Sequence, residues 1–488
     1  MDTAHRPWRR VAAGAGLGCL LAAIVVPAFA GAAFLQGGER GAHRAPRATH
    51  ASATSAAEVG ASVAPSMARG VGGRLLTEVA RVRVGPFPVA LAVAERQGHV
   101  FVLNQDPRET SRGSVSMLES RTGRVLGVAP VGRGARALAV DEGANRVFVL
   151  NAGPADPTGV QLGPNSVSVL DATTGRVLAT TPVGRDGDEV GALLVDARRV
   201  RVLVSLPSAL DILAVASGAP LGAIALPRDL AFTHEAGELV FDPASGALFV
   251  GEGTGGGGCP LPPLRRGSYS AVVCVAQLDG ATGWVRARIP IPSNDTLPQV
   301  VSGLADDSVA GRVVVYFADG HGGGYVAALA ATMPQASSAA DAPALAVDAL
   351  RGRTLVVTRP SSYEGPGPFT ASVFETRGGA LRGSVDVSEV GGLGRSSSEY
   401  AALPDAAVDG RTGHAFVVTG AFLPAAHAYG PSQSPRPNVV TVLDLARVKI
   451  LGALAVGRGQ PALVLDERTR RVFVANSADG TVSVLSIS

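Results

Sequence analysis

The chain has 488 residues, of which 46% are hydrophobic and only 17% charged, and it contains 62 Gly and 33 Pro. This composition suits many short strands joined by tight turns. The net charge is +3. Residues 1–70 hold seven Arg against Asp2, Glu39 and Glu58, so the rest of the chain is close to neutral. A near-neutral body has no basic surface for nucleic acid, so this partner class is excluded.

The N-terminal segment predicts export. Arg6, Arg9 and Arg10 precede an uncharged apolar run from Val11 to about Leu35. Residues 1–35 therefore read either as a secretory signal peptide, cleaved after Ala28-Phe29-Ala30, or as a single membrane anchor. Residues 36–73 have almost no large apolar side chain, so we expect a flexible low-complexity linker. We expect the remaining residues, 74–488, to lie outside the cytoplasm.

From residue 74 onward the chain repeats one unit of short β-branched runs. Leu138-Ala139-Val140-Asp141 leads to Val147-Phe148-Val149-Leu150-Asn151, and Leu463-Val464-Leu465-Asp466 leads to Val472-Phe473-Val474-Ala475-Asn476. A period of roughly 40–50 residues with four strands a unit is typical of β-propeller blades. The sequence therefore predicts an all-β propeller of four-stranded antiparallel blades over 74–488, acting as a monomer.

The number of repeats and the two chain ends predict how the ring closes. Pairs of first and second strands begin near Ala90, Ala137, Ala192, Glu238, Gly303, Ala344, Ala406 and Ala462. They predict eight blades, or seven if the least regular unit, from Gly303, is an elaboration of the ring. Residues 77–85 look like the last strand of a unit, whereas the chain ends after a third strand. We therefore expect the N-terminal strand to complete the last blade.

The repeated Asp and Asn residues have a structural interpretation. Asp141, Asp409 and Asp466, like their counterparts, follow first strands, where Asp accepts hydrogen bonds from backbone N–H groups and begins a tight turn. We expect Asn104, Asn151 and Asn476, which close second strands, to have a similar turn role.

These repeats resemble the YVTN-type β-propeller family. Val147-Phe148-Val149-Leu150-Asn151 stands at the family's Tyr-Val-x-Asn signature, and Val417-Val418-Thr419 echoes its Val-Thr. The resemblance covers 77–488. It implies the propeller fold and a place among exported or surface proteins of bacteria and archaea, but no particular activity.

No motif for a cofactor, metal or catalytic nucleophile stands out. Gly253–Gly258 satisfies Gly-x-Gly-x-x-Gly but opens no helix. Cys259 and Cys274 lie within one long insertion, and we expect them to form a disulfide, since two cysteines without a nearby histidine make a poor zinc site. We therefore predict no catalytic residue, no metal site and no cofactor.

The long insertions indicate where a ligand binds. They are 105–113, 152–164, 251–270, 359–369 and 419–437, all between second and third strands and hence on one rim of the ring. Tyr and Arg commonly anchor interfaces. The predicted binding residues on this rim are Tyr269, Tyr363, Tyr400, Tyr429, Arg265, Arg266 and Arg359.

The sequence therefore favours a non-enzymatic binding module for a protein, glycan or small ligand. Two alternatives stay open. One is a lactonase-like or lyase-like propeller enzyme with a metal or histidine in the channel, and the other is a structural envelope protein.

Overall fold

A computed structural model gives the architecture of the chain. It describes residues 24–25, 62–63, 75–105, 112–154, 163–185, 188–227, 230, 239–242, 245–252, 272–292, 299–307, 312–319, 324–329, 344–358, 369–377, 379–388, 401–421 and 437–488. In these ranges nearly all regular structure is β-strand, with one short 3-10 helix, η1 (Ser477–Asp479). No helix in the described part is long and apolar enough to cross a membrane.

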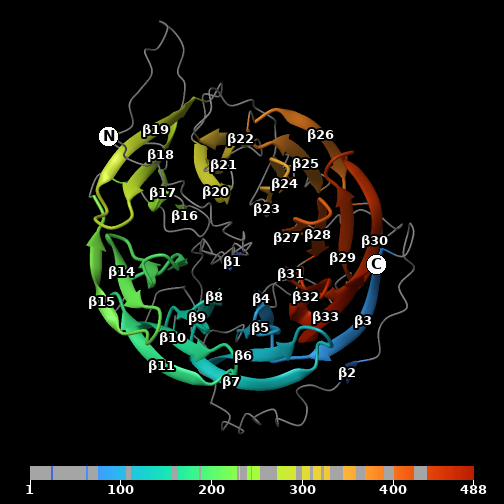
Figure 1. Cartoon of the computed structure of the whole chain (residues 1–488), viewed down its shortest axis with the longest axis horizontal. Helices are drawn as coiled ribbons and strands as arrows, with labels where there is room; N and C mark the ends of the chain where they lie inside the picture. Colours follow the sequence, from blue (N-terminus) through green and yellow to red (C-terminus); the bar gives the residue numbers. More distant parts are fainter. Residues whose placement is uncertain are drawn as a thin grey trace, which may run out of the picture.

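The strands form eight antiparallel sheets around a ring (Figure 1), numbered here in chain order. The first four are blade 1, β4 (Pro88–Ala94), β5 (His99–Asn104), β6 (Arg112–Glu119) and β7 (Val125–Arg133); blade 2, β8 (Ala135–Asp141), β9 (Arg146–Asn151), β10 (Asn165–Asp171) and β11 (Val177–Val183); blade 3, β12 (Leu193–Asp196), β13 (Arg201–Ser205), β14 (Ala209–Ala214) and β15 (Pro220–Ala225); and blade 4, β16 (Leu239–Asp242), β17 (Ala247–Glu252), β18 (Val272–Asp279) and β19 (Val285–Pro292).

The other four sheets continue the ring. They are sheet 5, β20 (Gln299–Asp307), β21 (Arg312–Asp319) and β22 (Gly324–Leu329); blade 6, β23 (Ala344–Asp348), β24 (Arg353–Thr358), β25 (Thr370–Glu375) and β26 (Leu381–Asp386); blade 7, β27 (Ala401–Asp409), β28 (His414–Ala421), β29 (Pro437–Asp444) and β30 (Lys449–Arg458); and blade 8, β31 (Pro461–Asp466), β32 (Arg471–Asn476), β33 (Thr481–Ile487) and β3 (Leu76–Arg83). Two-residue strands β1 (Ile24–Val25) and β2 (Ser62–Val63) pair with β8 and β3.

The all-β propeller predicted from the sequence is confirmed. Seven of the eight sheets are four-stranded antiparallel blades, and sheet 5 has three strands in the part of the chain that is described. Sheet 5 is the unit that the sequence marked as least regular. The described part of the chain thus has seven complete blades, which is the alternative that the sequence left open. Sheet 5 occupies the remaining position of the ring.

Ring closure by the N-terminal strand is also confirmed. β3 pairs antiparallel with β33 over Leu76–Arg83, so the outermost strand of blade 8 comes from the other end of the chain. Figure 1 shows the blue β3 along the outside of the red C-terminal strands. The third strand of the last blade, β33, is thereby paired on its outer edge. The same pairing fixes both ends of the propeller in the sheet.

The core lies between neighbouring blades. The first strand of each sheet contacts the first strand of the next, as in the pairs β4 with β8 and β27 with β31, so first strands surround the centre of the ring. Phe101, Phe148, Phe416 and Phe473 on second strands are at most 1% exposed. Burial of a side chain of this size contributes about 2–3 kcal/mol. The repeated Val-Phe-Val pattern therefore packs each sheet against its neighbours.

The strand order fixes two rims. Turns between first and second strands and between third and fourth strands lie on one rim, here called the turn rim. Connections between second and third strands, and links between blades, lie on the other, here called the long-loop rim. Because the blades are antiparallel, every unit repeats this assignment.

Candidate functional site

The seven predicted binding residues, Tyr269, Tyr363, Tyr400, Tyr429, Arg265, Arg266 and Arg359, all lie outside the described residues. The strands that flank them do bear on the prediction. β17 and β18, β24 and β25, and β28 and β29 are second and third strands of their blades. The connections 253–271, 359–368 and 422–436 therefore all leave from the long-loop rim. The 389–400 link, which carries Tyr400, joins blades 6 and 7 on that rim too.

The structure does not test the predicted disulfide as a pair, because Cys259 lies outside the described residues. Cys274 lies on β18 and is 1% exposed. The Cys259–Cys274 bond stays a prediction.

The Asp residues after first strands begin the turns of the turn rim, as predicted. Ala144 N–H donates to Asp141 Oδ1 at 2.9 Å, and Thr469 N–H donates to Asp466 Oδ1 at 2.8 Å. Asp196, Asp242, Asp348 and Asp409 accept backbone N–H groups two or three residues on in the same way. These carboxylates therefore form the turns of the turn rim by accepting backbone N–H groups.

The predicted turn role of Asn104, Asn151 and Asn476 is wrong. All three side chains are at most 1% exposed, and each amide donates to a serine hydroxyl of the third strand at 3.0 Å. Glycines near the end of the preceding outer strand pack against them: Gly132 lies on β7, Gly457 on β30, and Gly85 just after β3. A Cβ added to Gly85, Gly132 or Gly457 would lie 2.7, 2.5 or 2.4 Å from the Asn Cγ atom. In each case the glycine of the repeated Val-Gly pair therefore packs against the buried Asn of the next blade.

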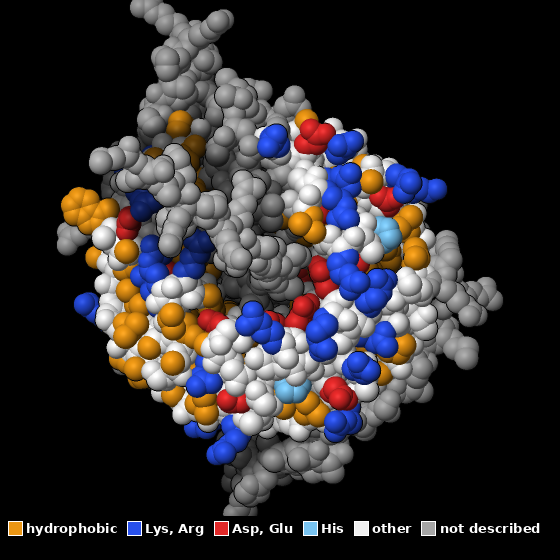
Figure 2. Space-filling view, viewed as in Figure 1, with side chains coloured by type: hydrophobic (Ala, Val, Ile, Leu, Met, Phe, Trp, Pro, Cys, Tyr) orange, Lys and Arg blue, Asp and Glu red, His pale blue; other side chains and the backbone are white. Residues whose placement is uncertain are grey.

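A row of glutamates connects blades 7, 8, 1 and 2 on the turn rim. Gly410 N–H donates to Glu467 Oε1 and Glu467 N–H donates to Glu95 Oε1, both at 3.0 Å. Glu95 N–H donates in turn to Glu142 Oε1. Figure 2 shows acidic side chains at the edge of the central opening, among Lys and Arg side chains. These glutamates, which the sequence analysis did not single out, hold adjacent blades together at the channel mouth.

Burial shifts the titration of two of these groups. Burial raises the pKa of Glu95, and the neighbouring Asp466 and Glu142 carboxylates add to that effect against the Glu467 N–H bond. Burial also raises the pKa of Glu467, against the bond from Gly410 N–H. Their hydrogen bonds come from backbone amides, so we regard the row as structural.

Asp405 is a carboxylate in the channel wall that the sequence analysis missed. It lies on the innermost strand β27, next to a bulge between Ala402 and Asp405. Leu463 N–H of β31 donates to Asp405 Oδ2 at 2.7 Å, and Ala406 N–H donates to Oδ1 at 2.8 Å. Burial raises the pKa of Asp405 to about 6, although both hydrogen bonds oppose the shift.

Asp405 should make stability depend on pH. Its folded pKa of about 6 exceeds the ordinary value of 3.8, so the folded state favours the protonated form. The stabilising contribution is complete below about pH 4 and is lost as the pH rises through 6. We expect the free energy of unfolding of the wild type, relative to Asp405→Asn, to fall by about 1–2 kcal/mol between pH 4.5 and 7.5. Urea denaturation of both proteins measures this, and parallel pH profiles would contradict it.

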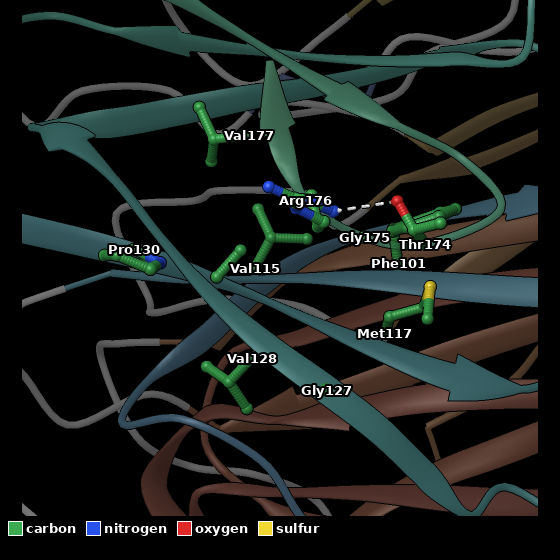
Figure 3. A pocket seen from close by; sticks show the side chains of 11 residues that line it. Phe101, Val115, Met117, Gly127, Val128, Pro130, Thr174, Gly175, Arg176 and Val177 are labelled. Carbon is green, nitrogen blue, oxygen red and sulfur yellow. Dashed lines mark hydrogen bonds between the residues drawn. The ribbon is translucent and has the colours of Figure 1, made fainter. Parts of the chain in front are cut away.

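A cavity of about 350 Å³ lies between blades 1 and 2, away from the channel. Figure 3 shows Val115, Met117 and Val128 of blade 1 near the turn Thr174–Val177 of blade 2. Gly127 on β7 also lines it, and a Cβ added there would meet nothing within 4 Å. The absence of a side chain at Gly127 contributes to the open space, and the lining is mainly apolar.

The two described histidines of the propeller lie at hairpins of the turn rim. His99 begins β5, where its Nδ1 is 2.8 Å from Ala172 O of blade 2, and His414 begins β28. His234, His321 and His427 lie outside the described residues. Among the side chains that are described, no three His, Cys, Asp or Glu residues lie together as a metal site.

Comparisons with known proteins show the fold alone. No family model matches the chain, and no curated protein matches it. Saccharomyces cerevisiae Sqt1 has a TM-score of 0.50 at 10% identity, covering 83% of this chain and 97% of its own. A europium-containing methanol dehydrogenase has a TM-score of 0.49 at 14% identity, covering 86% and 93%, and BamB from Moraxella catarrhalis has 0.47 at 14%, covering 84% and 99%. The β-propeller fold rests on the chain's own ring of sheets, and its resemblance to YVTN-type repeats stays a prediction.

Proposed function

We propose that this protein is an exported β-propeller of the YVTN type that acts as an extracytoplasmic binding module. Its partner, a protein, glycan or small ligand, docks on the long-loop rim. One observation carries the proposal: the connections between β17 and β18, β24 and β25, and β28 and β29 join second to third strands. Three of the longest insertions, far apart in sequence, thereby leave the ring on one side. Function is commonly carried by such loops on a rigid scaffold.

The opposite rim supports the proposal by contrast. Asp141 and Asp466 hold their turns through backbone N–H groups, and Glu95 and Glu467 join neighbouring blades. Short turns of this kind offer a partner little besides backbone and small polar groups. Variation in length is concentrated on the long-loop rim, where the Tyr and Arg residues predicted as anchors belong.

A second proposal is an enzyme of the lactonase-like or lyase-like propeller class. One observation favours it: Asp405 lies on an innermost strand, and its pKa of about 6 suits a general acid or base near neutral pH. Hydrolysis of a panel of lactones and esters tests this proposal. Turnover that Asp405→Asn abolishes would support the enzyme, and turnover unaffected by that change would argue against this residue.

Loop replacement tests the leading proposal. The bait is the soluble fragment 74–488, and the partner captured with it from the cell envelope is then purified. We expect short Gly-Ser links in place of 259–269 and 422–430 to abolish binding, since truncating one anchor costs about 2 kcal/mol or more. The melting curve should stay nearly unchanged, because both segments lie between strands rather than in them.

The matched control changes the turn rim. Arg468→Ala and Arg96→Ala alter exposed side chains at hairpins of blades 8 and 1. These variants should bind the partner as the wild type does. Binding that survives loop replacement but fails in the turn-rim variants would refute the proposal.

A further inference from the structure

Asp405 stands where blades 1, 2 and 8 have alanine and sheet 5 has Gly303. In blades 1, 2 and 8, a first-strand alanine pairs with the residue just before the Asn that ends the second strand. The pairs are Ala90 with Leu103, Ala137 with Leu150 and Ala462 with Ala475. In blade 7 the same register places Asp405 opposite Val418. The three alanines are at most 2% exposed. In these three blades the position holds a small apolar side chain, and blade 7 has a carboxylate instead.

The hydrogen bond to Leu463 places this carboxylate at the channel wall. β31 has one sheet neighbour, β32, so its other edge faces the channel. Leu463 N–H donates to Asp405 rather than to β32, so it points to that free edge. The Asp405 carboxylate thus lies across the inner junction of blades 7 and 8.

Asp405 lies midway along β27. β27 runs from Ala401 to Asp409, and Asp409 begins the turn on the turn rim. Four residue steps, about 13 Å, lead from Asp405 to Asp409, and four lead back to Ala401. Opposite Asp405, β28 continues only from Val418 to Ala421 before the long connection 422–436 begins. Asp405 is therefore about equally far from the two ends of its strand.

The carboxylate has no counter-ion among the described residues. Its polar contacts are the N–H groups of Leu463 and Ala406, and no cation contributes to its titration. Arg136, on the inner strand β8, is three blades further along the ring. A half-buried carboxylate is usually paired with a cation, because desolvation of an unpaired charge is costly.

We infer that Asp405 binds a basic side chain, arginine or lysine, that a protein partner inserts into the channel from the long-loop rim. This inference rests on the proposed function and narrows it to a protein partner. The incoming cation would supply the counter-ion that blade 7 lacks.

The probe is a dye-labelled peptide, Gly-Gly-Arg-Gly-Gly, with a citrulline version that has the same shape without the charge. Binding to the full-length protein is measured by fluorescence polarisation at pH 7.5 in low and high salt. The variants are Asp405→Asn, which keeps the shape, and Asp405→Ala, which restores the residue of the sister blades. Asp386→Asn, on the outer strand β26, is the charge-matched control.

We expect the wild type and Asp386→Asn to bind the arginine peptide in preference to the citrulline peptide. Both Asp405 variants should weaken arginine binding at least about tenfold, because a charge-assisted contact is lost. Equal binding of the two peptides, no binding to the wild type, or unchanged binding by Asp405→Asn would overturn the inference.

The loop-replaced variant separates this result from the proposed function. If the captured partner is lost on loop replacement but retained by Asp405→Asn, the long-loop rim is the binding site and the inference fails. If the partner survives loop replacement, the proposed function fails. The peptide measurement on the wild type and the Asp405 variants then still decides whether the channel takes a cation.

Discussion

Removal of residues 74–85 is expected to unfold the last blade and open the ring. β3 supplies the fourth strand of blade 8, and without it the edge of β33 loses its backbone partners. Val82 and Val84, at 4% and 6% exposure, would leave the core between blades 8 and 1. Their burial alone contributes about 3–5 kcal/mol, so we expect the free energy of unfolding to fall by at least that amount.

The fragments 74–488 and 86–488, compared by urea denaturation and thermal melting, measure this effect. The fragment 74–488 is the control, because both fragments lack residues 1–73 and only the second also lacks residues 74–85. Coincident unfolding curves for the two fragments would show that pairing of β3 with β33 does not contribute to the free energy of unfolding.

The substitution Gly132→Val is expected to be strongly destabilising. A Cβ at this position would lie 2.5 Å from Cγ of Asn151, whose side chain is fully buried and holds Ser168 of the third strand at 3.0 Å. The clash must displace either β7 or the asparagine, and overpacking of this kind costs about 1–3 kcal/mol. A displaced Asn151 amide would add the cost of a lost buried hydrogen bond, about 1 kcal/mol or more.

Gly127→Val on the same strand is the matched control. It introduces the same side chain, but a Cβ there meets nothing within 4 Å and faces the cavity between blades 1 and 2. We expect its free energy of unfolding to differ from the wild type by less than about 0.5 kcal/mol. Urea midpoints measure both variants. Equal destabilisation by the two would mean that the contact between Val-Gly and Asn has no special role.

The fold could be predicted from the sequence because one short pattern carries the blade. Val147-Phe148-Val149 and Val472-Phe473-Val474 form second strands as expected, and the match between residues 77–85 and other fourth strands predicted closure by β3. The eighth position was harder, because the unit from Gly303 departs from the pattern. In the described part that unit has three strands, β20 to β22.

The side-chain roles could be predicted only in part. Asp141 begins its turn through contacts two or three residues away, which local sequence reveals. Asn151 contacts Ser168 on the next strand and Gly132 on β7 of the preceding blade, so its role depends on how strands and blades pack. Local reasoning therefore assigned it wrongly to a turn.

Asp405 and the glutamate row needed a comparison between blades. Strict alignment of first strands shows Asp405 against Ala90 and Ala137, and that mismatch was available in the sequence. The sequence could not show that Asp405 contacts Leu463, because Leu463 belongs to the neighbouring blade. Glu95, Glu142 and Glu467 likewise occupy one repeat position in three consecutive blades, but only the ring brings each to the backbone of the next.

Hydrogen exchange of fragment 74–488 with and without its captured partner tests the central claim most directly. If the partner docks on the long-loop rim, protection should rise in 253–271, 359–368 and 422–436, while the turns after Asp141 and Asp466 exchange as before. Protection confined to those turns, with the three connections unchanged, would contradict a binding site on the long-loop rim.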